Sequence, residues 1–433
     1  MIFDTTFNGG LRLLVESTAA TDVAAVGVWY NRGSRDEPAH LAGATHIIEH
    51  MLFKGTERLS ASQIARRFDA MGGLINAFTE RETMGIHATI PMSGFIEAAH
   101  ILTDMITAAR FDPEEFKREI LVIENEITAS LDDVEEVAAD AFAQRYWGSH
   151  PLGRSIGGTP EDVKNKDRDQ VFSFYQNHFQ GKPHLITIAG GLTPDLIMQA
   201  FEPLLNVTTE YPQNVKPNTP LLHGPSYHGL SSQYVQVYYA LPGPDHINDN
   251  DYYALEVANA ALGDAMGSRL FQKLREELGL CYTIYSSPNL FRDCSLFSVY
   301  GTCAVTHAEE LIKRIHEEIT TIKIKGLTEE EIQHAKSHVA GMITIAAQDV
   351  EYKMRRLARQ ALYKSTIMTT QESIQKIDAI ELSDIQKSMD LFFQSSPVLF
   401  SAGPKSAEKR ITRCIEQILH SNRENKRTAH YDK

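Results

Sequence analysis

The chain of 433 residues has few cysteines, no long apolar runs and a deficit of positive charge. Its four cysteines all lie in the second half and form no C-x-x-C pair, which argues against a disulfide framework or a cysteine zinc cluster. No apolar run approaches the ~18–20 residues that span a membrane. Lys and Arg number 42 against 56 Asp and Glu, and the net charge of −14 disfavours nucleic acid as a partner.

The composition is that of a globular protein. Hydrophobic residues make up 42% of the chain and charged residues 23%, and the length is enough to bury large cores. The start, Met1-Ile2-Phe3-Asp4, has neither the basic and apolar regions of a signal peptide nor an Arg-rich transit sequence. We therefore expect a cytoplasmic protein whose cysteines are reduced thiols.

The five residues His46-Ile47-Ile48-Glu49-His50 are the most informative stretch. At about 100° per residue, His46 and His50 fall one helical turn apart on one face, and Glu49 lies beside them. Two imidazoles on adjacent turns are typical of a catalytic zinc site, which still needs a third ligand. The order H-x-x-E-H reverses the H-E-x-x-H of other zinc peptidases. Two histidines that merely cap and pack are the alternative.

A second segment, Asp112 to Ile127, is predicted to be a helix that carries paired carboxylates. Asp112 suits the N-cap, and Pro113 suits the first helical position. Glu119 and Glu126 are seven residues apart and so fall within about 20° of one another on a single stripe. One could bind a metal while the other supports the site, and a solvated acidic face is the alternative.

Further motifs extend the pattern, at Asn8–Leu11, at Gly33–Glu37 and in the run His46–Thr56. With them, nearly the whole chain resembles the pitrilysin/insulinase metallopeptidases, the inverzincins. It is most similar to the group of chains of about 50 kDa that includes mitochondrial processing peptidase.

This resemblance implies roles for particular residues. His46, His50 and Glu126 would bind one zinc ion per chain, and Glu49 would be the general base that takes a proton from the attacking water. Glu119 would be the supporting carboxylate of the site.

The stretch from Gly72 to Thr79 begins with a glycine turn and continues as a short strand. The resemblance implies an edge strand to which a peptide substrate adds as a further strand, through Asn76, Ala77 and Phe78. Asn76 would help to hold the substrate backbone, and Phe78 would line a side-chain pocket, with ordinary core packing as the alternative. The sequence Met84–His87 stands where the family commonly has tyrosines, which leaves the pocket shape open.

The second half has its own candidate residues. Arg275 and Tyr282 occupy the positions of an Arg and a Tyr that, in the resembled family, reach the active site of the first half. An arginine can hold a carbonyl or carboxylate, and a tyrosine hydroxyl can donate a hydrogen bond to a developing oxyanion.

The organisation of the chain predicts two halves. A strand pattern at Ala24–Tyr30 returns at Gln233–Tyr239, and the segment Thr208–Pro225 contains four prolines and few long apolar residues. We expect a catalytic half at 1–207, a linker at 208–225 and a second half at 226–433. The fold class is α+β, with helices on mostly antiparallel sheets. The resemblance implies two similar α/β rolls that face each other across a cavity.

Two further runs are interpreted structurally. Tyr146–Arg154 is expected to pack around the helix that carries Glu126. Glu351–Tyr363 is expected to be an amphipathic basic helix whose arginines, Arg356 among them, lie on a solvated face or an interface.

These observations favour a zinc endopeptidase that cuts short or unfolded polypeptides within a closed chamber. Chains of this size in the resembled family usually pair, as a homodimer or with a related subunit. Two alternatives remain: a non-catalytic partner subunit of a peptidase-like complex, and a peptidase dedicated to one precursor. The substrate and the metal carried in the cell stay open.

Overall fold

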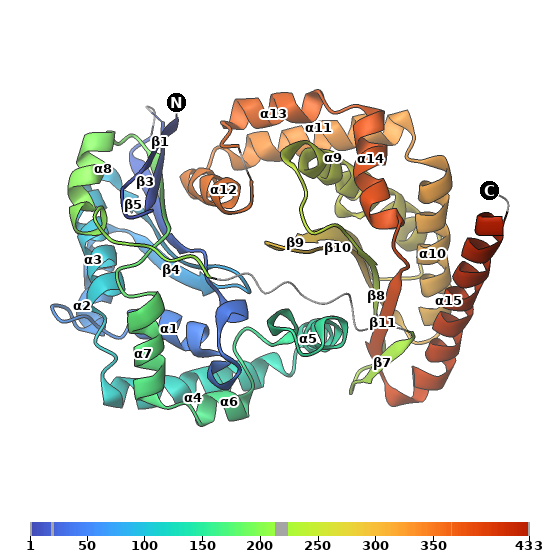
Figure 1. Cartoon of the computed structure of the whole chain (residues 1–433), viewed down its shortest axis with the longest axis horizontal. Coiled ribbons are helices and arrows are strands. Elements are labelled where there is room, and N and C mark those ends of the chain that lie inside the picture. Colours follow the sequence, from blue (N-terminus) through green and yellow to red (C-terminus); the bar gives the residue numbers. More distant parts are fainter. Residues whose placement is uncertain (1, 19–20, 213–223, 365, 432–433) are drawn as a thin grey trace. The chain divides into compact units, whose positions relative to one another are not determined.

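The computed structural model describes residues 2–18, 21–212, 224–364 and 366–431. The chain divides into two compact units, neither of them continuous in sequence (Figure 1). Unit 1 comprises Met1–Ser130, Arg154–Gln213 and Ile345–Thr369. Unit 2 comprises Leu131–Gly153, Asn214–Thr344 and Thr370–Lys433.

Unit 1 is built on one mixed sheet with the strand order β1-β2-β6-β3-β5-β4. Neighbouring strands run antiparallel except β2 and β6, which are parallel. The central strand β3 consists mainly of small and β-branched residues that are buried on both faces. The strand bounds are β1 Ile2–Thr6, β2 Arg12–Ser17, β3 Val23–Tyr30, β4 Leu74–Thr79, β5 Met84–Pro91 and β6 Leu185–Gly190.

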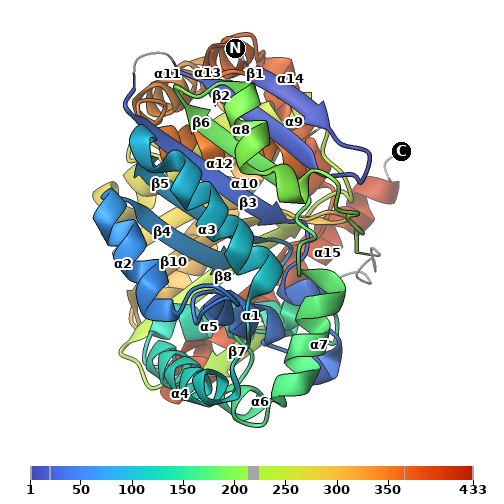
Figure 2. The ribbon, with the colours of Figure 1, turned by 90° about the vertical axis from the view of Figure 1, so that its left-hand side faces the viewer.

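Helices cover both faces of this sheet. In Figure 2, α2, α3 and α8 cross the face of the sheet that is turned toward the viewer. Side chains from these helices and from the sheet join in one large core, in which Phe68, Phe95 and Ile197 are fully buried or nearly so. The helix bounds are α1 Ala44–Leu52, α2 Ala61–Met71, α3 Phe95–Ala108, α4 Pro113–Ser130, α6 Pro160–Lys164, α7 Arg168–His178, α8 Pro194–Ala200 and α12 Val350–Tyr363.

The helix α12 comes from late in the sequence but packs on the sheet of unit 1. Met354 and Leu357, both fully buried, contact a cluster that includes Trp29. The expected amphipathic helix is present, and of the two places expected for its arginines, a solvated face or an interface, the solvated face does not hold for Arg356. Its side chain is buried and forms an ion pair with Glu16 of β2.

Unit 2 has a second sheet, with the order β7-β11-β8-β10-β9. Its strands are antiparallel neighbours except β7 and β11, which are parallel. The α+β class with mostly antiparallel sheets is therefore confirmed. The bounds are β7 Ser226–Gly229, β8 Tyr234–Pro242, β9 Thr283–Leu290, β10 Ser295–Ala304 and β11 Val398–Gly403.

Helix α5 (Val134–Trp147) packs on the sheet of unit 2 although it directly follows α4 in sequence. Phe142 of α5 stacks on Tyr238 with ring centroids 4.7 Å apart, and Phe400 lies against the same pair. Tyr146 and Trp147 belong to this cluster. Their expected packing around the helix that carries Glu126 is therefore wrong, because the aromatic side of α5 faces the second sheet.

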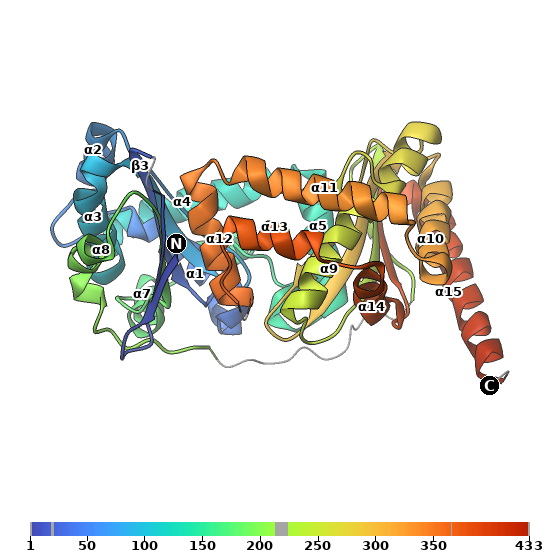
Figure 3. The same cartoon turned by 90° about the horizontal axis from the view of Figure 1, so that it is seen from above.

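Helices α9, α10, α14 and α15 contact this sheet, α10 through both β8 and β10, and α13 packs on α9. Figure 3 shows α10 and α15 lying side by side. The bounds are α9 Asp249–Asn259, α10 Ala308–Lys325, α11 Glu329–Ala346, α13 Thr370–Asp378, α14 Leu382–Phe393 and α15 Glu408–Tyr431, with π-helical turns at η6 Ala260–Asp264 and η7 Phe271–Glu277.

The compact units differ from the expected halves 1–207 and 226–433 in two segments, those that contain α5 and α12. Each of these helices packs on the sheet of the other half of the sequence. Of the expected linker 208–225, residues 213–223 lie outside the described residues. Among the helices that the structure describes, none is long and apolar enough to cross a membrane.

Candidate metal centre

Helix α1 carries the H-x-x-E-H residues. Ile47, Ile48 and Met51 are fully buried and anchor one side of the helix in the core of unit 1. His46 and His50 lie on the other side, one turn apart, with their Nε2 atoms 3.2 Å from each other. The i, i+4 spacing therefore has the effect expected from the sequence.

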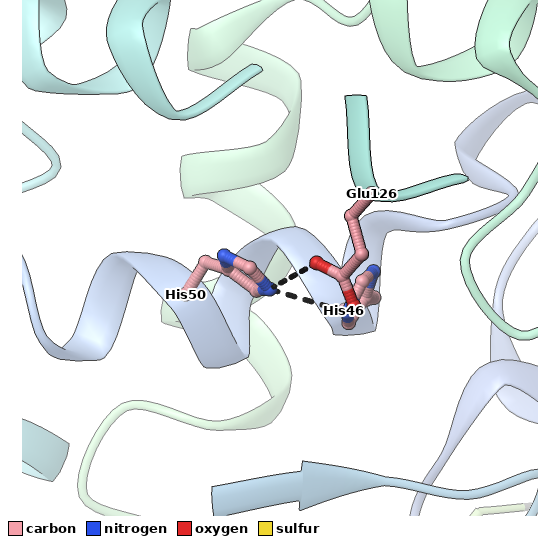
Figure 4. Close-up of side chains that lie close together, drawn as sticks. All are labelled: His46, His50 and Glu126. Carbon is pink, nitrogen blue, oxygen red and sulfur yellow. Dashed lines mark hydrogen bonds and ion pairs between the residues drawn. The ribbon is translucent and has the colours of Figure 1, made fainter. Parts of the chain in front are cut away.

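Helix α4 brings a carboxylate to the same point. Asp112 accepts backbone hydrogen bonds from Glu114 and Glu115, at 3.0 and 3.2 Å, which confirms it as the cap of this helix. Two turns after Glu119, the carboxylate of Glu126 lies 3.7 Å from His46 Nε2 and 3.5 Å from His50 Nε2. Figure 4 shows the three side chains pointing toward one another.

The donor set of His46, His50 and Glu126 fits a zinc ion. All three ligand atoms lie within 4.8 Å of one another. Two imidazole nitrogens bound to a tetrahedral zinc at ordinary bond lengths are about 3.3 Å apart, close to the separation found here. Burial and the neighbouring His50 lower the pKa of His46, which favours the neutral imidazole that a metal requires. The Glu126 side chain stays 55% exposed, so the centre is open to solvent on that side.

Glu119 lies behind His50 rather than at the convergence point. Its carboxylate accepts a hydrogen bond from His50 Nδ1 at 2.8 Å and forms an ion pair with Lys54 Nζ at 2.5 Å. Burial would raise the pKa of Glu119, but the hydrogen bonds from His50 and Lys54 outweigh it and hold the pKa below its usual value. A carboxylate in this place fixes the proton on Nδ1 and leaves Nε2 free to bind a metal.

Glu49 is held by a residue of the neighbouring strand. Thr79, the last residue of β4, donates a hydrogen bond of 2.6 Å to the Glu49 carboxylate. Burial raises the pKa of Glu49, and the Thr79 hydroxyl partly offsets that effect. The carboxylate is thus oriented, and its affinity for a proton is higher than that of an exposed glutamate, as a general base requires.

Strand β4 is the edge of its sheet, because among the strands that the structure describes it pairs with β5 alone. Asn76 is exposed, and its side-chain oxygen accepts a hydrogen bond from the backbone N–H of Ala77 at 2.9 Å. Ala77 is buried in the core of the unit. Phe78 is half-buried against Trp29, and the guanidinium of Arg355 lies over its ring, 5.4 Å from the centroid. The binding of substrate by these three residues stays a prediction.

Arg275 and Tyr282 lie together within unit 2. The guanidinium of Arg275, in η7, is 4.6 Å from the centre of the Phe271 ring and 5.5 Å from that of Tyr282. Tyr282 precedes the edge strand β9 and is 78% exposed. The structure thus brings this pair together in one unit and the metal-binding residues together in the other, and a shared role in catalysis stays a prediction.

Sequence reasoning missed Lys54 and Thr79. Lys54 lies two residues beyond the end of α1, and its nearness in sequence to His50 could have drawn attention to it. For Thr79 the sequence offers no comparable signal, because its contact with Glu49 depends on how the strand packs against α1.

Comparisons with known proteins identify a family in which zinc peptidases occur. Residues 12–160 match the family model described as insulinase (peptidase family M16), and residues 166–339 match the one described as the peptidase M16 inactive domain. Among solved structures, a protease from Helicobacter pylori superposes with a TM-score of 0.83 at 17% identity, over 93% of this chain and 100% of the other. At that identity the likeness shows the fold alone.

Two curated relatives, similar along nearly their whole length, also support the family assignment. An uncharacterized zinc protease of Streptomyces coelicolor is 31% identical over 92% of this chain and 89% of its own length. Another, from Mycobacterium leprae, is 30% identical over 96% of this chain and 95% of its own length. With both family models and full-length relatives in agreement, the chain belongs to the insulinase family of peptidases, family M16.

Proposed function

We propose that the protein is a zinc-dependent endopeptidase that hydrolyses peptides or unfolded polypeptides. The observation that carries this proposal is the convergence of His46, His50 and Glu126, with Glu49 on the same helix and aligned by Thr79. The two relatives named above, both called uncharacterized zinc proteases, support the same chemistry.

The metal ligands, Glu49 and Thr79 have different roles in the proposed hydrolysis. A zinc ion held by His46, His50 and Glu126 would polarise a peptide carbonyl and lower the pKa of a water molecule at the site to about 7. Glu49 takes the proton of the attacking water and later delivers it to the leaving amine. Thr79 holds one oxygen of Glu49 and leaves the other free for the proton.

The substrate class follows from the edge strand. The outer side of β4 offers backbone N–H and C=O groups that an extended peptide can pair with as an added strand. Such pairing recognises an extended backbone more than a particular sequence. A folded protein presents few segments of this kind, which favours short peptides and unfolded chains as substrates.

The test compares the zinc-loaded wild type with Glu49→Gln on a library of quenched fluorescent peptides. We expect cleavage that a chelator abolishes, and a fall of at least about 100-fold in the variant, the lower range for loss of a general base. Bound zinc should remain at one ion per chain in both proteins. Glu57→Gln, which removes an exposed carboxylate of the same unit, is the matched control and should leave cleavage unchanged.

Other outcomes separate the alternatives. Equal cleavage by wild type and Glu49→Gln would refute the role of Glu49. Cleavage of a single library sequence would favour a dedicated processing enzyme. Zinc-loaded protein that is inert until a related chain is added would indicate a heterodimer, and protein that binds no zinc would support a non-catalytic subunit.

A further inference from the structure

The Gly33–Glu37 segment contacts the start of α1 and the turn that follows β4, although its own residues lie outside the candidate site. Both carboxylate oxygens of Glu37 accept backbone hydrogen bonds at the start of α1, from Gly43 at 2.8 Å and from Thr45 at 2.7 Å. The Glu37 side chain is buried. A buried carboxylate that binds two N–H groups is a strong contact, because the charge strengthens both hydrogen bonds.

The start of α1 depends on this contact. Gly43, which precedes the helix, has a positive φ of 86° and offers no side chain to cap the first N–H groups. Without a partner these buried groups would each cost roughly 1–3 kcal/mol. Glu37 satisfies two of them and places a negative charge at the positive end of the helix dipole.

The same start is confined from a second side. A Cβ on Gly43 would lie only 2.5 Å from the carbonyl oxygen of Gly157, and a Cβ on Gly157 would lie 3.4 Å from His46 Nδ1. The loop that contains Gly157 begins at Arg154, which donates a hydrogen bond of 2.8 Å to the main-chain oxygen of Glu37. The loop at Gly157 therefore packs closely against the start of α1 and against His46, and leaves α1 little room to shift.

The other end of the segment is tied to the turn that follows β4. The backbone N–H groups of Ser34 and Arg35 donate to the carbonyls of Glu80 and Arg81, at 3.1 and 2.8 Å. The guanidinium of Arg35 also forms a buried ion pair with Glu82. The segment thus connects the end of the edge strand to the beginning of the helix that carries the candidate ligands.

We infer that Glu37 is a positioning residue, which sets the orientation of α1 and thereby of His46 relative to Glu126 and to strand β4. This role rests on the proposed function for its catalytic consequence, but its effect on metal binding does not. Burial outweighs the hydrogen bonds from Thr45 and Gly43 and the charge of Arg154, which lower the pKa of Glu37, and the net result is a pKa raised to about 7.

The test is Glu37→Gln beside Glu57→Gln, the exposed control, and Arg154→Met. A glutamine can accept from one of the two N–H groups, but its amide then faces the other as a second donor. We expect zinc to bind about 10- to 100-fold more weakly in Glu37→Gln, as when the residues that orient metal ligands are changed. Arg154→Met removes a side chain whose Nε and Nη1 atoms are buried without partners, so it should fold and show a smaller loss in the same direction.

Two measurements need no peptidase activity. Zinc affinity comes from competition with a chromophoric chelator, and amide hydrogen exchange of the metal-free proteins reports on residues 43–52. Exchange at Gly43 and Thr45 should be faster in Glu37→Gln and unchanged in Glu57→Gln. Where cleavage is measurable, kcat should fall with zinc fully bound, while KM changes little.

The result that would overturn the inference is a Glu37→Gln protein that melts at a lower temperature but binds zinc as tightly as the wild type, with unchanged exchange at the start of α1. Glu37 would then support the fold alone. The zinc affinity and hydrogen exchange of Glu37→Gln do not depend on the cleavage result for Glu49→Gln. Failure of the inference and failure of the proposed function can therefore be told apart.

Discussion

The contact between Glu119 and His50 allows a quantitative prediction. Glu119 is 5% exposed and binds His50 Nδ1 with one oxygen and Lys54 Nζ with the other. In Glu119→Gln the amide oxygen can still accept from Nδ1, but the amide nitrogen then faces the ammonium group of Lys54. A charge-assisted hydrogen bond is replaced by a neutral one, and two donors are brought together.

The expected cost is a loss of about 10- to 100-fold in zinc affinity, or roughly 1.4–2.8 kcal/mol. The assay is competition with a chromophoric chelator at neutral pH. Glu124→Gln, on the same helix but not at the convergence point, is the control and should bind zinc like the wild type.

A double variant sharpens this test. Adding Lys54→Met to Glu119→Gln removes the second donor, so the combined loss should be smaller than the sum of the two single losses. Additive losses, or a Glu119→Gln protein with wild-type zinc affinity, would show that Glu119 does not orient His50.

Two further predictions concern stability. Because burial raises the pKa of Glu37 from 4.5 to about 7, the folded state holds its proton to higher pH than the unfolded state. In urea unfolding, the free energy of unfolding of the metal-free wild type should therefore fall by about 3 kcal/mol relative to that of Glu37→Gln as the pH rises from about 4.5 to 7. A difference between the two proteins that does not change with pH would contradict this titration. Met354→Ala, in the fully buried face of α12, should cost about 2–5 kcal/mol, whereas Met342→Ala, at a 52% exposed position, should change the unfolding free energy little.

Local geometry explains what the sequence alone could predict about the centre. His46 and His50 share a helix face because they are four residues apart, and Glu119 and Glu126 share a stripe because they are seven apart. These relations hold for any regular helix. Which glutamate meets the histidines depends on where α4 crosses α1, and only the family resemblance assigned Glu126 to that place.

The contacts that were missed depend on tertiary packing. Thr79 reaches Glu49 because the end of β4 lies beside α1, and nothing within either segment specifies that approach. The apolar stripe of α12 likewise indicates that Met354 and Leu357 are buried, but not on which sheet. The sequence left Arg356 on a solvated face or at an interface, and its buried ion pair with Glu16, which is distant in sequence, could not be predicted from the helix alone.

The placement of α12 has a consequence for synthesis of the protein on the ribosome. The last strand of the first sheet is complete at Gly190, and α12 begins at Val350, roughly 160 residues later. At about 5–20 residues per second, the nascent chain waits about 10–30 seconds before that helix emerges. During this interval Leu14, Trp29 and Leu185 have no α12 to cover them. We therefore expect the nascent first unit to be prone to aggregation until α12 is made, and a fragment that ends at residue 207 to be less soluble than the whole chain.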